Sequence, residues 1–153
     1  MSDARFEDGD ARPLRLTALD AEDLRVVSAL VQDAVFPATE MRWDRKRRRF
    51  ALLINRFRWE APQPDAAERV RALLLIDDVL AVASQGVTRD DPDLVFSLLA
   101  LDFLPGEDGA GALSLILAGD GEIRLQVECL SVTLRDATRP YRAISGKAPR
   151  HED

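Results

Sequence analysis

The chain has little of what most catalytic and metal sites are built from. It contains one cysteine, Cys129, and one histidine, His151, which lies almost at the end of the 153 residues. A zinc site needs several converging Cys, His or carboxylate ligands, and a Ser-His-Asp or Cys-His arrangement needs a histidine within the folded part of the chain. The sequence therefore predicts no metal, no cofactor and no histidine-based catalysis.

Signals for export and for the membrane are also missing. A lone cysteine cannot form an intramolecular disulfide, so nothing points to an oxidising compartment. The first residues, MSDARFEDGDARP, lack the apolar run of a secretory signal. No window approaches the roughly 18 apolar residues that a membrane span needs. These absences predict a cytoplasmic protein that does not bind membranes.

Aromatic residues are scarce as well, at 6%, while 46% of residues are hydrophobic and 31% are charged. This composition is typical of a soluble globular protein whose core is made of aliphatic side chains. A chain of this length normally forms one domain, which we expect over residues 13–144. The polar ends, residues 1–12 and 145–153, are predicted to be flexible.

The net charge of −6 is very unevenly distributed. The stretch from Arg42 to Arg58 holds eight Arg and Lys residues and one acid, Asp44, so its local charge is +7 and the rest of the chain sums to −13. A net-acidic protein repels nucleic acid on average, and a basic patch would have to act against that field. Nucleic acid is therefore an unlikely partner.

The N-terminal part of the domain predicts a strand followed by a helix. PLRLTAL alternates apolar and polar residues with the period of a half-buried strand. Asp20 then stands where a helix N-cap belongs, with Asp23 in the first turn, and Leu24 opens a run of apolar residues at helical spacing. Pro37 cannot continue that helix, which is predicted over residues 20–34.

The basic stretch itself predicts an antiparallel hairpin. EMRWD and RRRFALLINRFRWE flank a polar turn at Asp44–Lys46 and are rich in aromatic and branched residues. Period-two alternation puts Arg56 and Arg58 on one face of the second strand and Phe57 on the other. Burial on both faces is expected only around Leu52–Ile54.

The second half of the chain predicts further strands. RVRALLLIDDVLAVASQGV is either one bent strand or two strands around Asp77-Asp78, and DDPDLVFSLL suggests a single helical turn. GALSLIL and EIRLQVECLSVTL are predicted to pair around Asp120-Gly121, a favoured tight-turn pair. Cys129 follows Leu125 and Val127 at period two, so its side chain is expected to be buried.

Together these elements predict an α+β fold that is mainly antiparallel β, as a curved sheet or a sandwich, with one long N-terminal helix packed on it. The order of elements in residues 13–78 is similar to that in residues 79–136, which suggests two tandem half-repeats. A sandwich without duplication is the alternative.

Four segments spread along the chain, LTALDAEDLRVVSALVQDA, EMRWDRKRRRFALLINRFRWE, RVRALLLIDDVLAV and IRLQVECLSVTLRD, resemble a small alphaproteobacterial family, domain of unknown function 2948. Asn55–Glu60, NRFRWE, is the most distinctive part of the resemblance. The resemblance implies a bacterial cytoplasmic protein and brings no known activity, substrate or catalytic residue.

The basic hairpin is the one distinctive surface that the sequence offers, and three interpretations stay open. It could be a solvated sheet edge whose cations pair with the protein's own acids, a site for a partner or anion, or a nucleic-acid site. We expect a non-enzymatic binding or assembly module that engages an acidic protein surface or a small anion. The candidate residues are Arg45, Lys46, Arg47, Arg49, Arg56 and Arg58.

The main alternative is an enzyme that acts on a phosphorylated or carboxylated metabolite, with Arg to hold the anion and a carboxylate as the base. Such an enzyme would need a concave pocket in which Arg and a carboxylate meet. The sequence pattern predicts no particular oligomeric state.

Overall fold

Strands dominate the structure, a computed structural model that describes residues 13–60, 68–88, 91, 93–137 and 141–142. The predicted flexible ends lie outside these residues. The elements are β1 (Arg15–Ala18), α2 (Ala21–Leu30), β2 (Val35–Pro37), the 3-10 turn η1 (Ala38–Glu40), β3 (Met41–Asp44), β4 (Arg49–Phe57), β5 (Glu68–Ile76), β6 (Val79–Gln85), β7 (Val95–Pro105), β8 (Gly111–Leu117), β9 (Glu122–Val127), β10 (Val132–Asp136) and β11 (Tyr141–Arg142).

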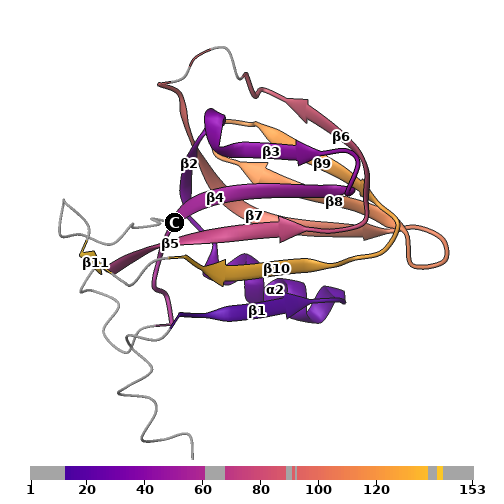
Figure 1. The fold of residues 1–153 in the computed structure, drawn as a ribbon, viewed down its shortest axis with the longest axis horizontal. Coiled ribbons are helices and arrows are strands. Elements are labelled where there is room, and N and C mark those ends of the chain that lie inside the picture. Colours follow the sequence, from indigo (N-terminus) through magenta and orange to yellow (C-terminus); the bar gives the residue numbers. More distant parts are fainter. Residues whose placement is uncertain (1–12, 61–67, 89–90, 92, 138–140, 143–153) are drawn as a thin grey trace, which may run out of the picture.

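All of the strand pairings in the described residues are antiparallel, in the order β1-β10-β5-β4-β2-β7-β8-β9-β6. The sheet folds over into two layers: β4, β5, β10 and β1 lie in front of β7, β8 and β9 in Figure 1. The short strand β2 joins the layers by pairing with both β4 and β7. The predicted α+β fold, mainly antiparallel, is confirmed. The tandem half-repeat stays a prediction.

The helix begins where the sequence indicates but ends early. The Asp20 carboxylate accepts a hydrogen bond from the Asp23 amide at 2.8 Å, so Asp20 is the N-cap. The helix stops at Leu30, and Asp33 adopts a positive φ of 66°. Its amide then donates to the carbonyl of Leu98 at 2.7 Å, which draws the chain into the sheet. The prediction of a long helix over residues 20–34 is therefore wrong at its C-terminal end.

Two other predictions concern the middle of the chain. Asp77 and Asp78 separate two strands, β5 and β6, and Asp78 has the positive φ of 58° that a tight bend requires. In DDPDLVFSLL, of which Asp90 and Pro92 lie outside the described residues, the predicted helical turn is wrong from Val95 on, because Val95 already starts β7 and pairs with Pro37 of β2. The β-branched and aromatic residues at the start of β7 favour this sheet pairing over a helical turn.

The Asp120-Gly121 hairpin joins β8 to β9 as predicted, with Asp120 at φ 68°. The strand does not then continue through Cys129. Residues 128–131 carry the chain from the back layer to the front layer, where β10 begins. Cys129 is therefore exposed, which corrects the prediction of a buried side chain, and its thiol donates to the Asp78 carboxylate at 3.1 Å. That hydrogen bond raises the pKa of the thiol.

The core lies between the two layers and is mostly aliphatic. The inward residues of β4, β5, β8 and β9 are fully or almost fully buried, as are those of α2 that face the sheet. Figure 1 shows α2 at the β1 edge of the molecule, where its buried residues Leu24 and Val27 cover one side of the fold. Among the described residues, no α-helix lies on the opposite side, between β3 and β6 (Figure 1).

Candidate functional site

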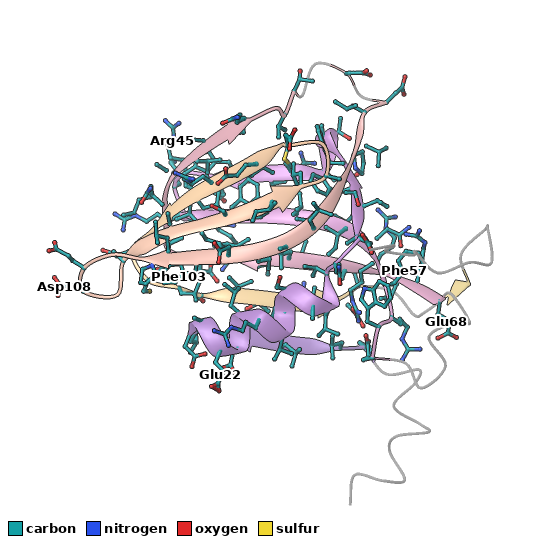
Figure 2. The ribbon with its side chains drawn as sticks, turned by 180° about the vertical axis from the view of Figure 1, so that it is seen from behind. Glu22, Arg45, Phe57, Glu68, Phe103 and Asp108 are labelled. Atoms are coloured by element: carbon teal, nitrogen blue, oxygen red, sulfur yellow. The ribbon has the colours of Figure 1, made fainter. Side chains whose placement is uncertain are left out.

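The candidate residues do not form one surface, because β4 carries them along the length of the molecule. Arg45, Lys46 and Arg47 lie in the exposed turn between β3 and β4, and Arg49 opens β4. Arg56 and Arg58 come at the other end of that strand, and a nine-residue strand spans roughly 30 Å. Figure 2 shows Arg45 far from Phe57 and Glu68. The six cations therefore divide into a turn group and an interior group.

Arg56 belongs to the interior group and is saturated with hydrogen bonds. Its Nε and Nη2 donate to the two oxygens of Asp136, both at 3.1 Å. Its Nη1 and Nη2 donate to the two oxygens of Glu60 at 2.9 and 2.8 Å, and Nη1 also donates to the carbonyl of Phe57 at 3.0 Å. A guanidinium has five N–H donors, so none remains for an external ligand.

The sheet register explains how Arg56 and Asp136 meet. Both side chains lie on the inward face of the front layer, and β5 runs between their strands. The inward residues of β5 at this level are Val70 and Ala72, which are small enough for the long Arg56 side chain to pass over them. Asp136 also accepts a hydrogen bond from the Leu14 amide at 2.8 Å. The cluster thus ties β4, β10 and the residues that precede β1.

Arg58 is buried as well and pairs with acids of its own chain. Its Nη1 donates to Glu68, and its Nε lies 3.9 Å from a carboxylate oxygen of Glu60. Phe57, on the opposite face of β4, is covered by the guanidinium of Arg69 at 3.8 Å from the ring centroid and by Trp59. Burial on both faces therefore occurs at residues 56–58, which corrects the expectation that placed it at Leu52–Ile54, where Leu53 is only half-buried.

The electrostatics of this cluster favour the charged forms. Burial opposes ionisation of Glu60, but the hydrogen bonds and the charge of Arg56 outweigh it and lower the pKa of the Glu60 carboxyl. In the same way, burial opposes the charge on Arg56, yet Glu60 and Asp136 together raise the pKa of the guanidinium. The interior group is a structural ion-pair network.

The lowered pKa of Glu60 predicts a pH-dependent contribution to stability. A carboxyl whose pKa is lower in the folded state stabilises the fold fully above its unfolded value, about 4.3, and loses this contribution as the pH falls through the folded value. We expect Glu60→Gln to unfold with about 1–3 kcal/mol less free energy at pH 7, since hydrogen bonds to charged groups contribute on that order. Urea unfolding at several pH values should show the two proteins converging below pH about 4. A constant difference across that range would contradict the assignment.

The turn group is only partly neutralised by the protein itself. Arg47 lies 3.9 Å from Asp44, Arg48 lies 3.4 Å from Glu128, and Arg49 donates to Asp77 at 2.8 Å. Within the part of the chain that the structure describes, Arg45 and Lys46 form no ion pair. The turn is therefore where unneutralised positive charge is concentrated.

A groove adjoins this turn, between the edge strands β3 and β6. Its volume is about 710 Å³, within the range of small-ligand sites in proteins. It is lined by Met41, Trp43, Arg45, Phe50, Leu80, Ala81, Val82, Ser84, Val87, Thr88 and Ile123. Most of this lining is apolar, and Arg45 is its one charged side chain among the described residues. We name this hollow the β3–β6 groove.

The sequence pattern could have predicted the β3 wall of this groove. Met41, Trp43 and Arg45 share one face of the β3 chain by period two, so a cation next to an apolar surface could have been expected there. The β6 wall could not, because only the folding of the sheet brings Leu80 and Val82 opposite β3. Arg45 is the one predicted site residue that lines the groove.

A second hollow, of about 430 Å³, lies on the outer face of the β8–β9 hairpin and does combine Arg with carboxylates. Its Arg124 is already paired with Glu122 at 3.1 Å, and Ser114 donates to the same carboxylate at 2.7 Å. The Ser114 hydrogen bond lowers the pKa of Glu122, which makes it a weaker base. This arrangement does not favour acid-base catalysis.

Among the residues that the structure places, no group of three or more His, Cys, Asp or Glu side chains could hold a metal ion. The helices in the same part of the chain are too short and too polar to cross a membrane.

Comparison with known protein families yields a match. Residues 14–151 match the model of a family described as a protein of unknown function, DUF2948. This confirms the resemblance to domain of unknown function 2948 that NRFRWE and the other segments indicated. No curated protein and no solved structure matches the chain.

Proposed function

Since the chain belongs to the DUF2948 family, whose description assigns no activity, we propose a function from its geometry: a non-enzymatic binding module that holds an anionic group at the β3–β6 groove. The anion is a small ligand or an acidic side chain of a protein partner. Arg45 binds it, and Lys46 adds to the positive potential at the mouth. The observation that carries the proposal is that Arg45 is the one charged residue in the described lining and has no carboxylate partner there.

The residues around Arg45 add apolar contact to the charge that this one side chain provides. Trp43 and Val82 are half-buried in the groove walls, and Phe50 and Ile123 connect the floor to the core. The apolar walls offer surface that the apolar body of a ligand can bury next to the exposed guanidinium of Arg45. A ligand with an apolar body and an anionic end would satisfy both parts of the groove.

Binding is favoured over catalysis because the groove lacks an evident base. Its polar side chains, apart from Arg45, are the hydroxyls of Ser84 and Thr88. A general base for acid-base chemistry would be a carboxylate or a histidine, and none lines the groove within the described residues.

The direct test is the variant Arg45→Glu. Wild-type protein is titrated by calorimetry with a panel of straight-chain and aromatic carboxylates, phosphate monoesters and polyglutamate. Charge-assisted hydrogen bonds contribute about 1.5–3 kcal/mol, so we expect the affinity of any ligand that binds to fall about tenfold or more in Arg45→Glu.

Arg42→Glu is the matched control, because Arg42 is an exposed cation of β3 that lies outside the groove lining and forms no ion pair in the described residues. It changes net charge by the same amount and should bind like wild type. If Arg45→Glu binds as tightly as Arg42→Glu, or if no member of the panel binds the wild type, the proposal is wrong.

A cytoplasmic location in a bacterium is part of the same proposal. The single cysteine and the family resemblance support it.

A further inference from the structure

The outer edge of β6 is open to pairing with another chain over Ala81–Gln85. Within the described residues β6 pairs with β9 alone and is the last strand of the sheet. Its sequence, VLAVASQ, contains no charged residue and no proline, and Leu80 is 49% exposed. Natural proteins usually block such an edge with Lys, Pro or a bulge near the open side, because unpaired backbone N–H and C=O groups bind other strands. β6 has neither of the first two devices, and its register shift lies at its start, between Val79 and Ala81, so Ala81–Gln85 form a regular edge that is open for pairing.

The second wall of the β3–β6 groove is also a strand edge. β3 pairs with β4 on one side, and its residues Trp43 and Arg45 line the same hollow as Ala81 and Ser84 of β6. Figure 1 shows β3 and β6 on the same side of the molecule, away from α2. Two sheet edges therefore face one another across an apolar groove.

This geometry selects a single extended segment as the occupant. The β6 strand of a second copy would bring β9 with it on its other edge, and β3 stands on the far side of the groove. The groove would therefore have to hold two strands of a second copy between β6 and β3. A single extended peptide has no such neighbour and occupies the width of one strand. Its side chains would alternate, one set toward the apolar floor and the other toward solvent.

We propose that the β3–β6 groove binds an extended peptide segment of a partner protein, which adds to the open edge of β6 as a further strand and carries an acidic residue for Arg45. The acidic requirement rests on the proposed function, whereas the strand pairing rests on the β6 edge. Charge complementarity favours an acidic segment, because Arg45 and Lys46 lie unneutralised at the turn next to the groove and the described lining has no acid. The bound segment would continue the back layer toward β3 and narrow the gap in the sheet.

The test starts from a random peptide library displayed on phage and selected in parallel on wild type and on Arg45→Glu. Wild type is expected to enrich peptides with alternating apolar residues and at least one Asp or Glu. A selected peptide is then synthesised in two forms, unmodified and with alternate backbone nitrogens methylated, which removes the hydrogen bonds that a strand donates. We expect the methylated form to bind about tenfold or more weakly, since each lost backbone hydrogen bond costs about 1 kcal/mol.

Amide hydrogen exchange of the complex locates the contact. The unmodified peptide is expected to slow exchange in β6 by about tenfold or more, while β1, the other end of the sheet, is unaffected. Unchanged β6 exchange, or equal binding of the methylated form, would overturn strand addition even if Arg45→Glu weakens binding, and the proposed function would then stand alone. Protection of β6 that does not depend on Arg45 would instead overturn the proposed function and the acidic requirement. Dimerisation through β6, detected by sedimentation and competing with the peptide, would overturn the choice of occupant.

Discussion

Arg56→Ala is expected to lower the free energy of unfolding by about 3–5 kcal/mol, because removing one partner of a buried ion pair leaves the other charges without compensation. The Arg56 side chain is fully buried and that of Asp136 is 2% exposed. The variant would leave Asp136 in the interior with one remaining hydrogen bond that the structure records, from the Leu14 amide. It would also open a cavity at the end of the core beside Val70.

Urea unfolding followed by circular dichroism measures this effect, and Arg42→Ala is the control. Arg42 comes from the same basic stretch but is exposed, so its removal should change the free energy by about 0.5 kcal/mol or less. Arg56→Lys should also be destabilised, since an ammonium has three donors on a single nitrogen and cannot replace the five hydrogen bonds that the guanidinium makes. A loss below about 1 kcal/mol for Arg56→Ala would mean that the network contributes no more than a surface pair.

The local pattern of the basic stretch predicted its secondary structure well and its chemistry poorly. Alternation correctly placed Arg56 and Arg58 on one face of β4, together with Leu52 and Ile54. That face is the inward one, so these two cations meet acids of the same chain. Asp136 could not be identified as a partner from the sequence, because it lies 80 residues from Arg56 and comes alongside only through the order β10-β5-β4.

Long-range pairing also explains why two elements were predicted wrongly. After the helix ends, the Asp33 amide bonds to the Leu98 carbonyl, and β7 starts where Val95 pairs with Pro37; no local window contains either contact. The same holds for the β3–β6 groove, since its two walls are brought together by the folding of the whole sheet. Periodicity predicts which face of a strand a residue lies on. The strand order decides which residues of other strands that face contacts.

The strand β2 is where the two layers are joined, so substitutions in it test how much that connection stabilises the fold. It has only three residues, yet it pairs with β4 in the front layer and with β7 in the back layer. Its central residue, Phe36, is fully buried, and its ring lies 5.7 Å from that of Phe96 on β7. Aromatic pairs at this separation add to the stabilisation that burial provides.

Phe36→Ala is expected to cost about 3–5 kcal/mol, the usual range for truncating a buried phenylalanine. Phe36→Leu keeps most of the volume and should cost about 1.5 kcal/mol or less. Val95→Ala is the control, because Val95 pairs with β2 but is 57% exposed. Thermal and urea unfolding should rank the three variants in that order, with exchange of β2 and β7 amides accelerated most in Phe36→Ala. If all three variants were equally stable, β2 would not be the strand that holds the two layers together.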